Sequence, residues 1–210
     1  MKKIYKYFTI LILMSSISYG SDIGINFGAV MQPVNINNNF SVITGGKAGV
    51  NITKNYFAGL ALYGMTLFKK ELNGTDVNSK LKPTLELNYY GVEFEYYLHP
   101  ENTMHFSAGF FAGMADIYFD VPVSKDADSN LYVPGYKTGV SNLIIQPSVN
   151  FNLNLKSFYR VVLGFSYRFF PNFEYTIQEL LHDSNNTPYT LKSENINGFA
   201  INFVVRLGSF

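Results

Sequence analysis

The chain has 210 residues, of which 47% are hydrophobic, and its length suits one or two ordinary domains. Its net charge of +1 argues against a polyanion binder that depends on a basic face, so no nucleic-acid partner is expected. The sequence contains no cysteine, which excludes disulfides, thiolate zinc sites, lipidated cysteine and cysteine nucleophiles.

The first residues have the order of a secretory signal peptide. Three early lysines precede an apolar stretch at 8–14, and small or polar residues follow up to Gly20. The apolar stretch is about half as long as the roughly 20 residues of a membrane-spanning helix, which favours cleavage over a membrane anchor. We therefore predict a signal peptide over 1–20 and one mature domain over 21–210. No later apolar run is long enough for such a helix, so a mature membrane protein must be built from strands.

From residue 22 onward, apolar and polar residues alternate with period two, which is typical of strands with one apolar face. In the clearest case, the odd positions from Leu143 to Leu155 are apolar, and Asn, Gln and Ser occupy most of the even positions. The pattern predicts eight strands, at 22–31, 40–53, 56–68, 85–98, 104–119, 140–155, 158–170 and 196–208.

Short and long connections alternate between these strands. The short links fall at 53–55, 99–103 and 156–157, and the long polar links fall at 32–39, 69–84, 120–139 and 171–195. In an up-and-down meander, this alternation places the tight turns at one end and the long loops at the other. The predicted fold class is all-β: an eight-stranded antiparallel up-and-down transmembrane β-barrel with short periplasmic turns and long extracellular loops.

The alternation alone does not say which face points outward, so a soluble barrel with an apolar interior is the alternative. The interior of an eight-stranded barrel is only just wide enough for side chains. The set of Gly, Ser and Asn fits inside, whereas the aromatic set does not, so we expect the aromatic set to face lipid. Those expected to form an interfacial girdle at the strand ends are Tyr56, Phe57, Tyr96, Tyr97, Phe158 and Tyr159.

These features resemble the small eight-stranded outer-membrane β-barrel proteins, the group of the OmpA barrel, OmpX and OmpW. The resemblance covers the mature chain, and its last strand ends in Phe210 as in that family. It implies outer-membrane lipid as the surroundings and the barrel assembly machinery as a partner that reads Phe210 as a C-terminal assembly signal. In the family, apolar positions step back by twos from the last Phe. Here Arg206 and Gly208 hold those positions, and a bulge near Gly208 would restore the phase.

Six charged residues have the parity of the lumen: Lys47, Glu93, Glu95, Arg160, Arg168 and Arg206. Opposite charges in a narrow lumen should pair, because an unpaired buried charge is costly. We expect the two glutamates to meet Lys47, Arg160 and Arg206 across the lumen, which favours a structural plug over a gate or ion path. This assignment requires a bulge at 88–90, because Leu85 and Leu87 have the opposite parity to the apolar residues that follow them.

Three further segments are weak candidates for chemistry or binding. His105 and Ser107 have a spacing similar to the His-x-Ser of outer-membrane lipid A deacylases, but their inward parity near a tight turn predicts that they line the lumen. The segment 126–130 begins like a calcium loop and then lacks the required Gly and Glu. The segment 176–182 is expected to form one or two helical turns. We therefore expect no catalytic, cofactor-binding or metal-binding residues.

The sequence thus predicts an integral outer-membrane barrel protein of the bacterial cell envelope that is not an enzyme. We expect a mostly closed lumen, no cofactor and a monomer. The loops at 120–139 and 171–195 would carry any binding or adhesion role toward an extracellular ligand. The alternatives are a narrow porin for small solutes, a lipid-modifying enzyme that depends on Ser107, and a soluble ligand-binding barrel.

Overall fold

The computed structural model describes residues 23–37, 39–67, 70–71, 84–121, 124–125, 132–133, 136–177 and 189–210. The expected signal peptide and the calcium-loop candidate lie outside these residues. So does most of the helix expected at 176–182, and the two positions of it that are described belong to a strand. Within the described ranges, no helix has the length and apolar character needed to cross a membrane.

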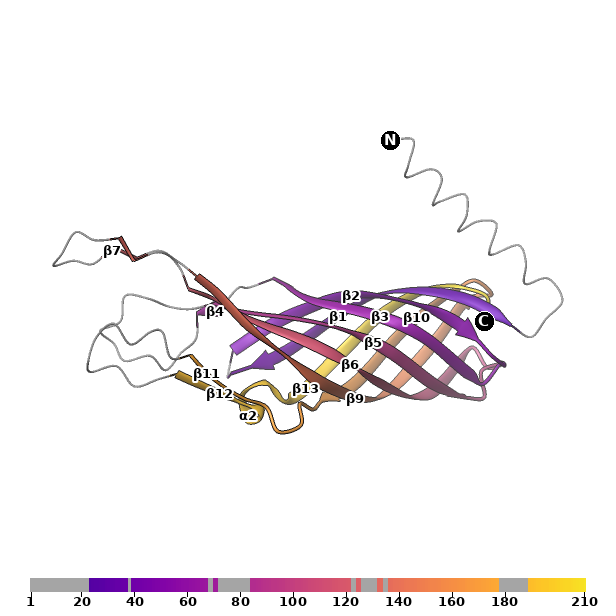
Figure 1. Ribbon diagram of the computed structural model, residues 1–210. Coiled ribbons are helices and arrows are strands. Elements are labelled where there is room, and N and C mark those ends of the chain that lie inside the picture. The colour runs from indigo at the N-terminus through magenta and orange to yellow at the C-terminus, as the bar shows by residue number, and fades with distance from the viewer. Residues whose placement is uncertain are drawn as a thin grey trace, which may run out of the picture.

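Eight long strands form a single antiparallel sheet that closes on itself (Figure 1). These strands are β1 (Gly24–Ile36), β2 (Asn39–Asn51), β3 (Tyr56–Leu67), β5 (Thr84–Leu98), β6 (Met104–Val121), β9 (Tyr136–Lys156), β10 (Tyr159–Arg168) and β13 (Gly198–Gly208). Each pairs with its neighbours along the chain, and β1 pairs with β13 to close the barrel. The predicted eight-stranded antiparallel barrel is therefore confirmed.

Short elements extend the loop end of the barrel. The two-residue strand β4 (Lys70–Glu71) adds to β5, and β7 (Ser124–Lys125) pairs with β8 (Tyr132–Val133). In the last connection, β11 (Glu174–Ile177) pairs with β12 (Tyr189–Lys192), and the helix α2 (Ser193–Ile196) follows. Figure 1 shows β11, β12 and α2 gathered at the end opposite to the C-terminus.

The long loop expected at 32–39 is not present. β1 continues to Ile36 and β2 begins at Asn39, so only a short link joins them. The reason lies in the alternation, which runs on past Met31: Val34 and Ile36 are buried, and the residue between them is exposed. Pro33 and Asn35 thus lie in β1, which keeps an inward face up to Ile36.

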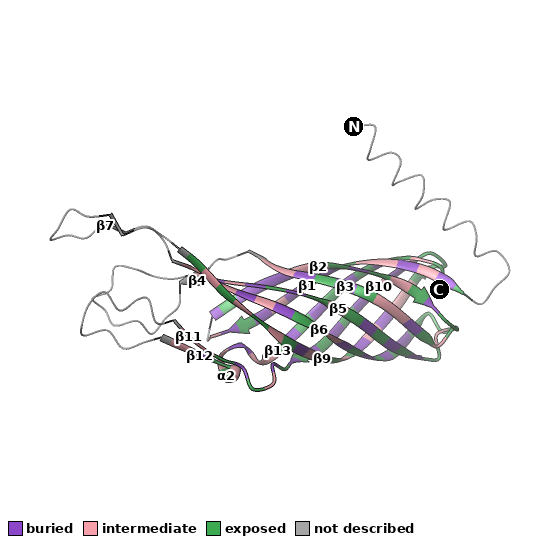
Figure 2. Ribbon diagram, in the orientation of Figure 1, coloured by how far each residue is buried: buried purple, intermediate pink, exposed green. Residues whose placement is uncertain are grey.

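The outer wall of the barrel is apolar, as the aromatic pattern predicted. Phe94, Phe106, Phe165 and Phe199 are all more than half exposed, and Figure 2 shows exposed and buried residues alternating along the strands. On β6 the outward positions are apolar from Met104 to Met114, and Asp116 ends this stretch. Its length matches the roughly 9–11 residues of a tilted transmembrane strand.

The expected aromatic girdle is only partly correct. Tyr56, Tyr96 and Phe158 are exposed on the outer wall. Phe57 and Tyr97 are each 1% exposed and lie inside the barrel, so placing them in the girdle was wrong. Each follows an outward aromatic residue directly in sequence, and strand alternation therefore turns it inward.

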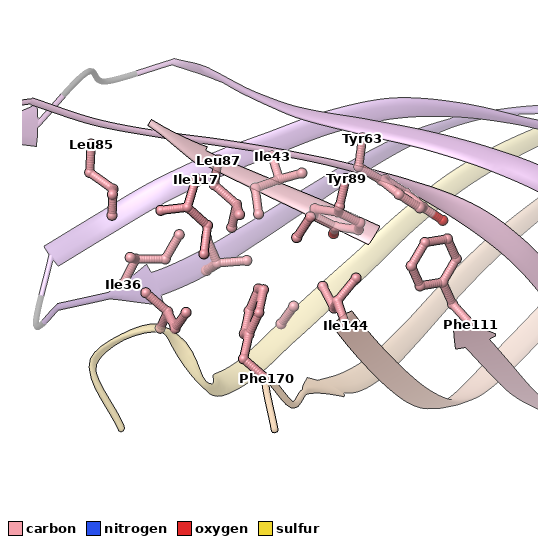
Figure 3. Packing of buried hydrophobic residues seen from close by; sticks show 14 of the residues in the cluster. Ile36, Ile43, Tyr63, Leu85, Leu87, Tyr89, Phe111, Ile117, Ile144 and Phe170 are labelled. Atoms are coloured by element: carbon pink, nitrogen blue, oxygen red, sulfur yellow. The ribbon is translucent and has the colours of Figure 1, made fainter. Parts of the chain in front are cut away.

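The loop half of the barrel is filled by apolar side chains. Leu85 and Leu87 point inward with Tyr63, Tyr89 and Phe111 (Figure 3). The register between β5 and β6 is unbroken, so the bulge expected at 88–90 is absent. We assumed that the apolar residues of β5 share one outward face, and this was wrong. The loop half of β5 carries a second apolar set, which points inward and fills the interior.

We predict that a cation in the middle of the outer wall destabilises the barrel. Val149 is exposed at the centre of the outward apolar stretch of β9. Val149→Arg should lower the free energy of unfolding by about 2–4 kcal/mol in lipid vesicles, because a charge at the bilayer midplane is costly. The matched control is Ser141→Arg on the same face of β9, beyond the apolar stretch, with an expected change within about 0.5 kcal/mol. Equal effects in urea titrations would contradict the assigned membrane position.

Candidate functional site

Two buried ion pairs lie in the half of the lumen nearer the tight turns. Lys47 Nζ lies 2.6 Å from Glu93 Oε1, and both side chains are buried. Arg206 Nη2 forms the second pair with Glu95 Oε2, and both of these side chains are fully buried. Strands β2, β5 and β13 present these residues at inward positions, where they can meet across the narrow interior.

Glu95 is the centre of a hydrogen-bond network. Its Oε1 accepts hydrogen bonds from Ser107 Oγ and from Asn150 Nδ2, the latter at 3.2 Å. Arg206 donates to Glu95 through Nη2 and to the Tyr97 hydroxyl through Nη1. Both carboxylate oxygens of Glu95 therefore have donors, which lowers the cost of burying its charge.

Arg160 has no carboxylate partner in the described part of the chain, so the expected contact with a glutamate was wrong. Its Nε donates to Asn154 Oδ1 at 2.6 Å. Its guanidinium carbon lies 4.7 Å from the centre of the Tyr97 ring and 4.2 Å from that of Phe210. Aromatic faces attract a guanidinium electrostatically, so they take the place of the expected carboxylate.

Arg168 lies outside this charge cluster. It ends β10 at the loop end of the barrel, about 26 Å along the strand from Arg160. The side chain is 0% exposed, and its Nη2 lies 3.4 Å from the Asn35 carbonyl oxygen. The six residues thus share an inward face, but the tilted length of the barrel separates this one from the others.

A layer of neutral polar residues lies between the charges and the apolar half. The Tyr89 hydroxyl donates to Gln32 Oε1 at 2.7 Å, and Gln32 Nε2 donates to Asn202 Oδ1 at 3.0 Å. Ser166 also donates to Asn202, and Gln146 donates to Ser166. A neighbouring cavity of about 20 Å³ has room for about one water molecule. We did not single out this layer from the sequence, although its members show the inward alternation.

The connection between β10 and β13 covers the apolar half of the lumen. Phe170, Phe173, Leu191 and Ile196 belong to the same buried cluster as the apolar side chains of the barrel strands. Phe173 directly precedes β11, Leu191 lies within β12, and Ile196 ends α2. The loop end of the barrel is therefore closed by side chains of its own chain.

His105 and Ser107 both line the lumen, as predicted. Ser107 Oγ donates to Glu95 and accepts a hydrogen bond from Asn152 Nδ2 at 2.8 Å. His105 Nδ1 lies 3.2 Å from the Asn102 carbonyl oxygen, and no hydrogen bond joins the imidazole to the hydroxyl within the described residues. Ser107 belongs to the hydrogen-bond network of Glu95, whereas His105 contacts a backbone carbonyl of the β5–β6 turn, and neither is aimed at the lipid-facing wall.

The carboxylate beside Ser107 was not assigned from the sequence. The β5–β6 register, with Tyr97 opposite Ser107, places Glu95 near this serine. The contact between Glu95 and Ser107 could have been predicted only if the register of this hairpin had been known. No group of three or more potential metal ligands occurs within the described ranges.

The C-terminal strand keeps its phase to the end. The register of β13 with β1 is continuous from Phe203 to Gly208, so the bulge expected near Gly208 is absent. A Cβ atom at Gly208 would lie 2.3 Å from the Ile25 carbonyl oxygen, which explains why a glycine fits this position. Phe210 accordingly shares the lumen side with Arg206 and lies against Arg160.

We predict that the Glu95–Arg206 pair is essential for stability. Glu95→Gln keeps the volume but leaves the buried guanidinium of Arg206 without its counter-charge, so the free energy of unfolding should fall by about 3–5 kcal/mol. The control is Glu86→Gln, which breaks the partly exposed pair with Lys137 and should cost about 0–1 kcal/mol. If urea titrations show that both variants lose equally little, the buried pair does not hold the lumen together.

The chain is similar in fold to solved outer-membrane barrels. It matches Neisserial surface protein A (NspA) with a TM-score of 0.56 and 10% identity, over 90% of this chain and 98% of that one. It matches a major outer membrane protein from Thermus thermophilus with a TM-score of 0.56 and 9% identity, over 88% of this chain and 99% of that one. No protein-family model matches the chain, and no curated protein matches it by sequence. The described residues thus have the closed eight-stranded fold of outer-membrane barrels.

Proposed function

We propose that the chain is an integral outer-membrane protein of the bacterial cell envelope with a closed barrel that acts through its outer end and is not an enzyme. The observation that carries this proposal is the filled interior. Ion pairs occupy the turn half, and the apolar cluster occupies the loop half. Between them lies a cavity of only about 20 Å³. An exposed apolar wall supports a position within lipid.

Planar-bilayer recording tests the closed barrel against the narrow porin. We expect no steady conductance from the purified protein, because the cavity between the two halves of the lumen has room for about one water molecule. A porin of known conductance, measured in the same bilayer, controls for insertion and sensitivity. A large and steady single-channel conductance of the protein would reject the closed-barrel proposal.

The outer end offers a surface for a binding or adhesion role. β6 and β9 remain paired beyond the apolar wall, up to Val121 and Tyr136. The outer face of this extension is polar, with Lys137 Nζ 2.6 Å from Glu86 Oε2 and Ser141 Oγ 2.5 Å from Asp116 Oδ1. A rigid ladder that projects past the lipid can hold a binding surface away from the membrane.

Single cysteines test this orientation, because the chain has none of its own. Ser141→Cys lies on the projecting ladder, and Lys54→Cys lies in a turn at the opposite end. A membrane-impermeant maleimide should label Ser141→Cys on intact cells and Lys54→Cys only after the outer membrane is broken. The reverse pattern would place the loops in the periplasm and contradict the proposal.

We further propose that Phe210 is read by the barrel assembly machinery. Deletion of Phe210 should lower the amount of heat-modifiable, folded barrel in outer-membrane fractions, whereas Phe210→Tyr should keep it near the wild-type level. Refolding of both variants in detergent separates assembly from stability, because the loss of the Arg160–Phe210 contact alone is expected to cost about 0.5–2 kcal/mol. Wild-type amounts of the deletion variant in cells would show that Phe210 carries no assembly signal.

A further inference from the structure

A groove of about 430 Å³ lies on the outer wall of the barrel. Ala108 of β6 contributes to its lining, and Tyr96 lies opposite this alanine on β5. The next outward side chains along β6 are Phe106 and Phe110, both exposed. The groove exists because one small side chain lies among large aromatic ones, which leaves the wall hollow at this point.

Aromatic side chains form the walls of the groove. Phe94 and Phe110 line it, together with Tyr56 and Tyr96, whose ring centres lie 5.0 Å apart. Its volume falls within the roughly 300–1,000 Å³ of small-molecule sites in proteins. An occupant must therefore be apolar along the part that enters the groove.

The groove lies near the end of the barrel that carries the tight turns. Ala108 is four positions from Met104, where β6 begins, which corresponds to about 13 Å along a tilted strand. This depth lies within one leaflet, since the hydrocarbon core of a bilayer is about 30 Å thick. The acyl chain of a lipid in that leaflet reaches such a depth while its headgroup stays at the level of the turns.

A positive charge is available at the level of the headgroup. Ile52 and Tyr56 both line the groove, and the exposed Lys54 lies between them in the β2–β3 turn. The β5–β6 turn carries an acidic residue, Glu101, whose carboxylate lies 3.5 Å from His99 Nδ1 in the same turn. Lysines at a membrane surface attract anionic headgroups.

We propose that this groove binds one acyl chain of an anionic phospholipid, whose phosphate group lies against Lys54. The proposal rests on the proposed function, because the groove meets lipid chains only if the barrel spans the membrane. Charge complementarity favours an anionic lipid as the occupant. A second copy of this chain is the competing occupant, and the experiment separates the two.

Fluorescence quenching tests this site, because the chain lacks tryptophan and each reporter is therefore the only indole. Phe94→Trp places the reporter in the groove wall. Phe165→Trp is the matched control, since Phe165 is exposed on the same outer wall, opposite Val149, which in turn lies opposite Ala108. Each variant is reconstituted into phosphatidylcholine vesicles that contain a small fraction of brominated phosphatidylglycerol or brominated phosphatidylcholine.

The expected result is a preference for the anionic lipid at the groove reporter alone. Brominated phosphatidylglycerol should half-quench Phe94→Trp at a roughly fivefold lower fraction than brominated phosphatidylcholine. Phe165→Trp should show no preference. Adding Lys54→Gln to the groove reporter should remove the preference, and adding Ala108→Phe should reduce its quenching to the level of the control.

Three outcomes overturn the proposal in different ways. Equal quenching of Phe94→Trp by the two brominated lipids would reject an anionic-lipid site. Protection of Phe94→Trp from both lipids, with normal quenching of Phe165→Trp, would show that a second copy covers the groove. Absence of quenching at both reporters would reject the membrane-spanning barrel itself, and with it the proposed function.

Discussion

The narrow width of an eight-stranded barrel determines which side chains fit inside it and how they must pair. Such an interior holds side chains and little else, so an inward polar group is costly unless it meets a partner on another strand. Glu95 meets this requirement with Arg206, Ser107 and Asn150 as donors. At the other end, α2 and the segments around it add apolar side chains that complete the filling.

This constraint sorts the lumen into three layers. Ion pairs lie near the tight turns, amides and hydroxyls lie in the middle, and apolar side chains lie toward the loops. Because the layers follow one another along the barrel axis, a solute would have to displace both charged pairs and apolar packing. We therefore propose that the interior serves stability and that the functions of the protein lie on the outer wall and at the loop end.

The sequence predicted the eight long strands, apart from the end of β1, and most of the outward aromatic residues, because period-two alternation follows directly from strand geometry. It also predicted that the two glutamates meet Lys47 and Arg206, as the structure shows. It did not predict which glutamate pairs with which cation, because that depends on the register and tilt of strands far apart in the chain. Arg160 illustrates this limit, since Asn154 and two aromatic rings take the place of the expected glutamate. Leu85 and Leu87 show a second limit: alternation marks two faces but does not say that an apolar face must point to lipid.

Thiol accessibility inside the folded barrel tests the filled lumen most directly. Ala115 and Ser107 are both buried, in the apolar and polar halves respectively, and both accept a cysteine with little change in volume. In the reconstituted barrel, Ala115→Cys and Ser107→Cys should resist a small water-soluble methanethiosulfonate reagent, and both should react once the protein is unfolded. Rapid reaction of Ala115→Cys and Ser107→Cys in the folded barrel would reveal a water-filled path and contradict the account.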